Sequence, residues 1–291
     1  MSNFTLLEAR TRVCPFGVRF WDAAEQSYVS DGLSVYLRLS GSRVRYATKV
    51  NTAGIFFAQG LPGLRAAEQG AGDAAYWASV STMGFVVEVA DSLGQFMPFS
   101  FPAQLPARGL FLWSCALSSP PASAGLGDGV PLFSSPSRSV SPMRAVIRAQ
   151  LQDASTGNPA SGAVLSASVG GAPPVLGIAD AQGRVAIVMP YPEPSDFPVL
   201  GDGSSPPYTP TGAPLTSYTW SVTLGAQYAA STTYPAYPDL CSTLSQPTAT
   251  LWGDTSGASL PAQTLALGTD LVVRSVDATN GTPLPVLLVA G

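Results

Sequence analysis

The 291-residue sequence contains no histidine, and this absence decides most of the chemistry open to it. Without an imidazole the chain cannot assemble a Ser-His-Asp or Cys-His nucleophile. The usual zinc sites and the commonest proton-transfer group at neutral pH are missing as well. The cysteines Cys14, Cys115 and Cys241 are too few and too scattered for an iron–sulfur or structural zinc site. We therefore expect a protein that is not an enzyme and that has no catalytic residues, no cofactor and no metal.

Paired carboxylates are the one route to hydrolysis that this composition leaves open. A glycosidase needs two acidic side chains about 5 to 10 Å apart in a cleft. Two pairs have a suitable spacing, namely Glu88 with Asp91 and Glu193 with Asp196. Glu88 alternates with valines in a predicted strand, so its side chain is expected to face solvent. Glu193 and Asp196 lie in a proline-rich stretch, which favours solvated loop carboxylates over a catalytic pair.

Metal and phosphate sites find little support elsewhere in the chain. Asp128 and Asp202 each stand between two glycines, a loop context that can supply a calcium ligand. Calcium requires several converging oxygens, whereas each of these loops has one carboxylate, so both are interpreted as turns. No GxxxxGK[ST] motif and no strand–GxGxxG–helix pattern is present to bind phosphate.

Aromatic residues in predicted loops are the remaining candidates for a binding surface. Exposed aromatic rings bind the faces of sugars and anchor protein interfaces. Four residues outside the predicted strands fit this description and are the candidate interface aromatics: Tyr228, Tyr234, Tyr237 and Trp252. Packing within the loops or the core is the alternative for all four.

The charge content bears on partners and location. Charged residues make up only 11% of the chain, against about 25% in a typical soluble protein. A surface so poor in charge favours a part that other proteins cover, with a secreted Ala/Ser/Thr-rich domain as the alternative. The net charge of -4 and the lack of any basic run argue against nucleic-acid binding. No apolar run is long enough for a membrane helix, and the first residues do not resemble a signal peptide, so we expect synthesis and assembly in the cytoplasm without membrane insertion.

The elements that must position these residues are predicted to be strands. The chain has 29 glycines and 27 prolines, and proline is excluded from helix interiors and central strands. Apolar residues alternate with a period of two over residues 33–39, and similar apolar stretches cover 85–89, 145–151, 184–188 and 219–224. Short, frequently interrupted strands of this kind are typical of β-sandwiches. We predict an all-β fold of two or three immunoglobulin-like or prealbumin-like sandwich modules joined by Pro/Gly/Ser-rich loops.

Composition places the module boundaries. Residues 1–113 are predicted to form an N-terminal β-sandwich, and the Ser/Pro/Gly-rich residues 114–142 a linker. Residues 143–291 are predicted to form a second sandwich with a long proline-rich loop over 190–214, and residues 215–291 could be a third small module. Cys14 and Cys115 lie near the two ends of the first module, which leaves a disulfide between them open.

A repeated turn pattern organises the strands. Residues 153–159 and 277–283 both begin with aspartate and end with proline, with Gly157 or Gly281 in the turn, and a looser copy begins at Asp22. Aspartate can accept hydrogen bonds from backbone amides two residues further on, and glycine tolerates a positive φ. These aspartates are therefore predicted to shape turns and not to bind ligands.

Residues 146–190 resemble the carboxypeptidase regulatory-like, or prealbumin-like, β-sandwich domain. The motifs that carry the resemblance are Asp153-x-x-Thr156-Gly157-x-Pro159, the strand over 163–169, and Asp180-x-x-Gly183-Arg184 followed by a strand that ends at Pro190. The resemblance covers about 45 residues. It implies a sandwich fold that serves as a spacer or docking unit and carries no chemistry.

The first module, taken with the second, resembles structural proteins of phage-tail-like contractile injection systems. The segments involved lie at residues 18–35, 60–65, 89–99, 105–110 and 131–136, and the resemblance extends to residue 190. It implies a non-enzymatic structural component, baseplate-associated or peripheral, whose partners are other subunits in a multi-copy particle that can be released from the cell. The alternative hypothesis is a carbohydrate-binding or adhesion protein that uses its loop aromatics.

Overall fold

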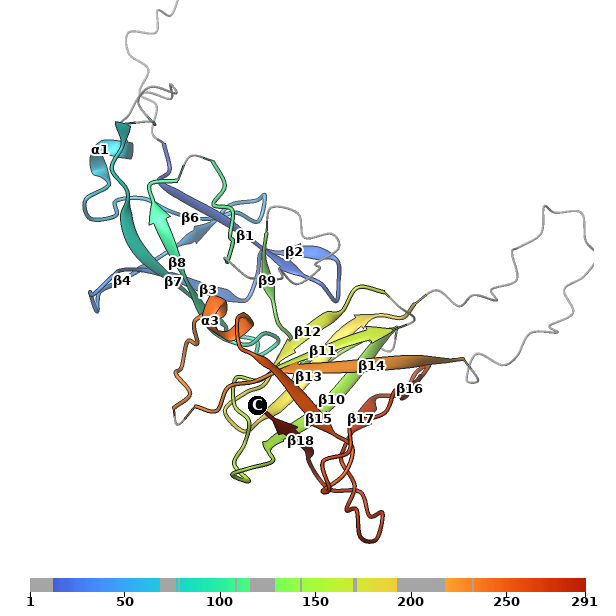
Figure 1. Ribbon diagram of the computed structural model, residues 1–291. Coiled ribbons are helices and arrows are strands. Elements are labelled where there is room, and N and C mark those ends of the chain that lie inside the picture. Colours follow the sequence, from blue (N-terminus) through green and yellow to red (C-terminus); the bar gives the residue numbers. More distant parts are fainter. Residues whose placement is uncertain are drawn as a thin grey trace, which may run out of the picture.

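The computed structural model describes residues 13–68, 77, 79–107, 109–115, 129–141, 143–169, 172–192, 218–231 and 233–291. Nearly all of the regular secondary structure in these residues is β-strand, which confirms the predicted all-β fold (Figure 1). The helices α1 (Arg65–Glu68) and α3 (Leu240–Leu244) are short. The strands gather into two modules that contact each other.

The first module consists of two facing sheets. One has the order β2-β1-β6-β5, with β9 paired to β1 in parallel, and its strands are β1 (Phe16–Asp22), β2 (Ser27–Val29), β5 (Lys49–Val50), β6 (Phe56–Ala58) and β9 (Gly129–Leu132). The other has the order β4-β3-β7-β8, formed by β3 (Leu33–Leu39), β4 (Arg45–Ala47), β7 (Met83–Asp91) and β8 (Phe99–Leu105).

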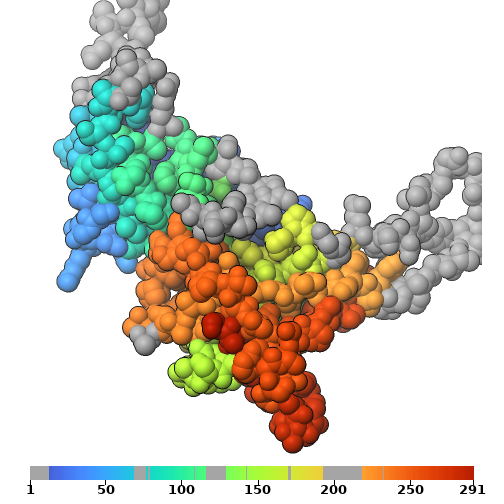
Figure 2. All heavy atoms as spheres, viewed as in Figure 1, coloured from blue at the N-terminus to red at the C-terminus, as the bar shows by residue number. Residues whose placement is uncertain are grey.

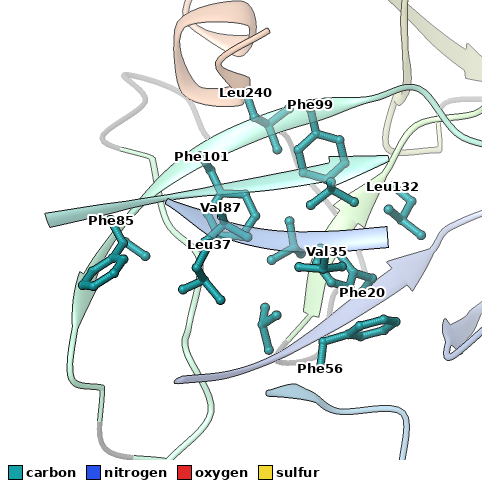
Figure 3. Close-up of a cluster of buried hydrophobic side chains, with 14 of the residues drawn as sticks. Phe20, Val35, Leu37, Phe56, Phe85, Val87, Phe99, Phe101, Leu132 and Leu240 are labelled. Atoms are coloured by element: carbon teal, nitrogen blue, oxygen red, sulfur yellow. The ribbon is translucent and has the colours of Figure 1, made fainter. Parts of the chain in front are cut away.

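Alternation explains how these two sheets enclose a core. In β1, Phe16, Val18 and Phe20 are fully buried, because a period of two directs them all to one face. Val35 and Leu37 of β3 are buried from the opposite sheet. Figure 3 shows Phe20, Val35 and Leu37 converging between the sheets. Burial of this many large apolar groups is the main stabilising contribution to the module.

The second module is one sheet path bent around a second core. Its order is β12-β11-β14-β15-β18-β10-β13, with β16 paired to β14 and β17 to β10. The strands are β10 (Arg144–Asp153), β11 (Val164–Val169), β12 (Val175–Ile178), β13 (Arg184–Pro190), β14 (Thr219–Gln227), β15 (Thr248–Trp252), β16 (Gln263–Ala266), β17 (Leu271–Val273) and β18 (Leu287–Ala290). The end strands β12 and β13 also contact each other, so the sheet wraps around its apolar residues.

Two features of the predicted organisation change in this topology. Strand β18 pairs in parallel with β10, so the C-terminal strands belong to the second module's sheet and form no separate third module. Strand β9 lies within the predicted linker over 114–142 but pairs with β1, because the alternation of Val130 and Leu132 buries both in the first core. Residues 116–128 of that linker, and residues 193–217, which include most of the predicted long loop, lie outside the described part.

Candidate functional site

The acidic pair Glu88 and Asp91 is engaged in structural contacts. Contrary to the prediction, the Glu88 side chain is only 6% exposed, because Arg38 and Arg45 cover it. The Nε atoms of these arginines lie 3.0 and 2.7 Å from its two carboxylate oxygens. Asp91 instead accepts the backbone N–H of Leu93 at 2.9 Å and shapes the turn after β7. Glu88 thus pairs with two arginines and Asp91 holds a turn, so both carboxylates are already engaged in contacts within the fold.

The aspartates of the repeated pattern shape turns, as predicted. Asp153 and Asp277 each accept the backbone N–H of the residue two positions further on, at 2.8 and 2.7 Å. Asp180, in the hairpin motif that follows, accepts from Gln182 at 2.9 Å. Asp22 accepts from Ala24 in the same way at 2.9 Å. Asp254, which the sequence pattern did not single out, makes the same turn and accepts from Ser256 at 2.8 Å. Each carboxylate thus replaces a missing backbone partner where the chain reverses.

No group of three or more cysteine, aspartate or glutamate side chains in the described residues is placed to hold a metal ion. Among those residues there is also no helix long and apolar enough to span a membrane. Asp128, Asp202, Glu193 and Asp196 lie outside the described residues.

Tyr228, the first candidate interface aromatic, belongs to the core. Its side chain is buried directly after β14, and its hydroxyl donates to Oδ2 of Asp153 at 3.1 Å. Burial and this hydrogen bond raise the pKa of Tyr228 to about 12. Burial alone would raise the pKa of Asp153, but its hydrogen bonds from Ser155, Thr156 and Tyr228 hold that pKa below its ordinary value. Tyr228 therefore ties β14 to the turn after β10 and presents no ring to a partner.

The other three candidate aromatics are also partly buried by neighbouring loops. The ring of Tyr234 packs over Gly162, and burial raises the pKa of Tyr234 to about 12. Arg45 stacks over the ring of Tyr237, with 5.1 Å from its Cζ atom to the ring centre. Trp252 is the last residue of β15 rather than a loop residue, and the turn at Gly257 covers its ring. Their arrangement favours packing between segments over an open aromatic platform.

A different aromatic group lies on the surface, at residues that were not among the candidates predicted from sequence. Trp21 and Tyr28 contact edge to face with their ring centres 5.1 Å apart, and Arg19 stacks on Tyr28 at 5.1 Å. Tyr28 is 37% exposed. The alternation in β1 could have predicted this placement from sequence, because inward-facing Phe20 requires Arg19 and Trp21 to face outward.

The two modules meet at a junction where apolar side chains, a backbone hydrogen bond and a disulfide come together. Leu240 and Leu244 of α3 belong to the same buried cluster as Phe99 of the first module. In Figure 3 the Leu240 side chain points from the helix toward Phe99. The backbone N–H of Ser100 donates to the carbonyl of Pro238 at 2.8 Å, so the chain before α3 adds to the edge of β8. Figure 2 shows the two modules in contact.

A disulfide crosses this junction. Cys115 is bonded to Cys241, the second residue of α3, with their Cα atoms 5.4 Å apart. The pairing of Cys14 with Cys115 that the sequence left open is therefore wrong, because α3 brings Cys241 to the end of the first module. Cys14 is a free thiol that donates to the carbonyls of Phe16 and Ala58, both at 3.1 Å, and burial raises its pKa.

Two arginines of β10 also connect the modules. Arg144, the first residue of β10, lies 3.0 Å from the Glu25 carboxylate in the turn between β1 and β2. Arg148, further along β10, donates at 2.6 Å to the carbonyl of Pro136 in the segment that follows β9. These contacts hold the start of the second module against the first.

Comparison with known proteins adds little to this geometry. No protein-family model and no curated protein matches the chain. A solved structure titled "The Bacillus anthracis TIE protein" aligns with 91% of this chain at 9% identity and a TM-score of 0.24. The alignment covers 34% of that protein, so this chain spans about a third of its length. A score this low supports no conclusion about shared fold or function.

Proposed function

We propose that this chain is a non-enzymatic structural component of a contractile phage-tail-like injection particle, baseplate-associated or peripheral. Its partners are other subunits of a multi-copy assembly, and neither nucleic acid nor membrane insertion is part of its role. The chain is made and assembled in the cytoplasm and reaches the outside as part of a released particle. The sequence resemblance of residues 18–190 supplies the class of particle.

The observation that carries the proposal is the shared core at the junction. A subunit that transmits load or fixes spacing has to behave as one body, and two modules on a flexible linker cannot do so. Here Leu240 and Leu244 bury their side chains in the first module's core, and the chain at Pro238 hydrogen-bonds to Ser100. The two sandwiches are therefore joined by apolar packing as well as by the chain.

The use of the acidic side chains is consistent with a structural role. Carboxylates that could serve catalysis hold turns, as Asp91 and Asp153 do, or pair with arginines, as Glu88 does. An acid that already accepts several hydrogen bonds is poorly suited to exchange protons with a substrate. Absence of turnover by the purified chain is therefore part of the proposal.

Deleting the gene and imaging particles tests this role. The expected result is particles that are incomplete or fail to contract, with recovery when the unaltered chain is supplied. A peptide tag inserted after Gly41, in the hairpin between β3 and β4 that protrudes in Figure 2, serves to locate the chain by immunogold labelling. A Cβ at Gly41 would have no atom within 4 Å, so the insertion should be tolerated. Intact, working particles without the chain would refute the proposal.

A carbohydrate-binding or adhesion function is the second candidate, and one observation favours it. Trp21 and Tyr28 present aromatic surface beside Arg19, a combination that suits stacking on a sugar ring with an acidic substituent. A glycan array separates the two candidates. Binding that is lost in Tyr28→Ala and kept in Tyr237→Ala would support adhesion through this surface, and no binding by the unaltered chain would exclude it.

A further inference from the structure

The Cys115–Cys241 bond joins two segments that other contacts already hold in place. On one side, the N–H of Phe111 donates to the carbonyl of Gly17 at 2.6 Å, and its ring packs against Phe16 with centres 6.1 Å apart. This anchors the segment that leads to Cys115 on the first module. On the other side, Cys241 follows directly after Leu240, which is fully buried against the same module. The two sulfur atoms are therefore brought together by packing that does not require the bond.

Both cysteines are also half-buried and not enclosed in the core. A disulfide that is partly exposed can be reached by small thiols and disulfides, unlike one sealed in apolar surroundings. A reducing cytoplasm keeps such pairs as thiols, and an oxidising exterior closes them.

We propose that Cys115 and Cys241 form a redox-responsive disulfide that stabilises the module junction. The pair is open as two thiols in a reducing compartment, and it closes when the folded chain meets an oxidised low-molecular-weight disulfide. In closing, one protein thiolate attacks the small disulfide and releases one small thiol. The second protein thiolate then displaces the other small thiol, so the protein loses two electrons and two protons and the small disulfide gains them.

Closing this disulfide tethers the segment around α3 to the first module. This segment connects β14 to β15 in the second module while lying on β8 of the first. The bond spans a sequence separation of 126 residues, and closing so long a loop restricts the unfolded chain strongly. Closure should therefore raise the unfolding temperature by about 10 °C and slow local opening of the α3 segment.

The test follows the whole chain in both redox states. The chain is expressed in a reducing cytosol, denatured in N-ethylmaleimide at lysis, and its mass is measured. All three cysteines should be alkylated. A second portion is purified folded under reducing conditions and then incubated with oxidised glutathione. When this portion is denatured in N-ethylmaleimide, only Cys14 should be alkylated. Oxidation should raise the unfolding temperature by about 10 °C and slow amide exchange over residues 237–245 about tenfold.

Matched variants identify the pair responsible. Cys14→Ser should respond to oxidant as the unaltered chain does, whereas Cys115→Ser and Cys241→Ser should keep the lower unfolding temperature with or without oxidant. Three results would overturn the proposal: a bond fully formed at lysis, a reduced chain that is unfolded, or oxidation that changes neither unfolding temperature nor exchange. These measurements need no particle, so they stand or fall independently of the structural role proposed above.

Discussion

Arg138 and Asp22, which are 116 residues apart in the sequence, form a buried bidentate ion pair. Nη1 of Arg138 donates to Oδ1 of Asp22 at 3.1 Å, and Nη2 donates to Oδ2 at 2.6 Å. Each side chain is only 5% exposed, and the guanidinium also lies over the ring of Phe96. The pair fixes the segment after β9 to the end of β1, immediately before the chain enters the second module.

The first prediction concerns the loss of one member of this pair. Arg138→Met leaves the Asp22 carboxylate buried without its cation, which should lower the free energy of unfolding by about 3 to 5 kcal/mol. The comparison is Arg144→Met, because the Arg144–Glu25 pair is partly exposed and should contribute less than about 1 kcal/mol. Urea unfolding of both variants measures the two losses. Equal effects would show that burial of the first pair is energetically unimportant.

The second prediction separates two tyrosines whose pKa values are both raised to about 12. Tyr228 donates to Asp153, so Tyr228→Phe should cost about 2 kcal/mol at neutral pH. The hydroxyl of Tyr234 is buried and finds no hydrogen-bond partner among the described residues, so Tyr234→Phe should be neutral or stabilising. Thermal or urea unfolding of the two variants at pH 7 gives the comparison.

The same tyrosines predict an alkaline limit to stability. A tyrosine whose folded-state pKa exceeds its unfolded value of about 10 stabilises the fold fully below pH 10. That contribution is lost as the pH rises from about 10 to about 12, because the unfolded chain ionises first. The slope of unfolding free energy against pH in this window should therefore be smaller in Tyr228→Phe. An unchanged slope would mean that Tyr228 ionises equally in both states.

Local patterns were sufficient to predict several of the strands and turns. The alternation over Leu33–Leu39 matches β3, and the Asp153 and Asp180 turns form as their sequences indicate, because these features depend on residues close together in the chain. The errors concern long-range pairing. Glu88 is buried because register places it near Arg38 and Arg45, which depends on three strands at once. The partner of Cys115 depends on where α3 lies, and no local pattern encodes that position.

A fourth prediction compares two turn glycines with similar backbone angles. Gly157 and Gly183 have φ of 73° and 76°, a region that costs a residue with a side chain about 1 kcal/mol. A Cβ at Gly157 would have no atom within 4 Å, so Gly157→Ala should cost about that amount. A Cβ at Gly183 would collide with the carbonyl oxygen of Leu151, which is backbone and cannot rotate away.

Gly183→Ala should therefore cost more than about 3 kcal/mol, because the hairpin between β12 and β13 must move away from β10. Denaturant unfolding of the two alanine variants tests the difference. Similar losses would indicate that the Leu151 backbone yields easily, and that the close approach of these strands is not fixed.

The last prediction addresses how strongly the modules are coupled. Leu240 is fully buried in the first module's core although it belongs to a connection of the second. Leu240→Ala should cost about 2 to 5 kcal/mol and split a single unfolding transition into two, because it removes the fully buried member of an apolar contact to which Leu244, Val164 and Ile178 also contribute. Leu112→Ala is the control, since Leu112 is 63% exposed and its loss should change stability by less than about 0.5 kcal/mol. Calorimetry under reducing conditions isolates this effect from the disulfide. If Leu240→Ala still unfolds in one transition at an unchanged temperature, the shared core does not couple the two sandwiches.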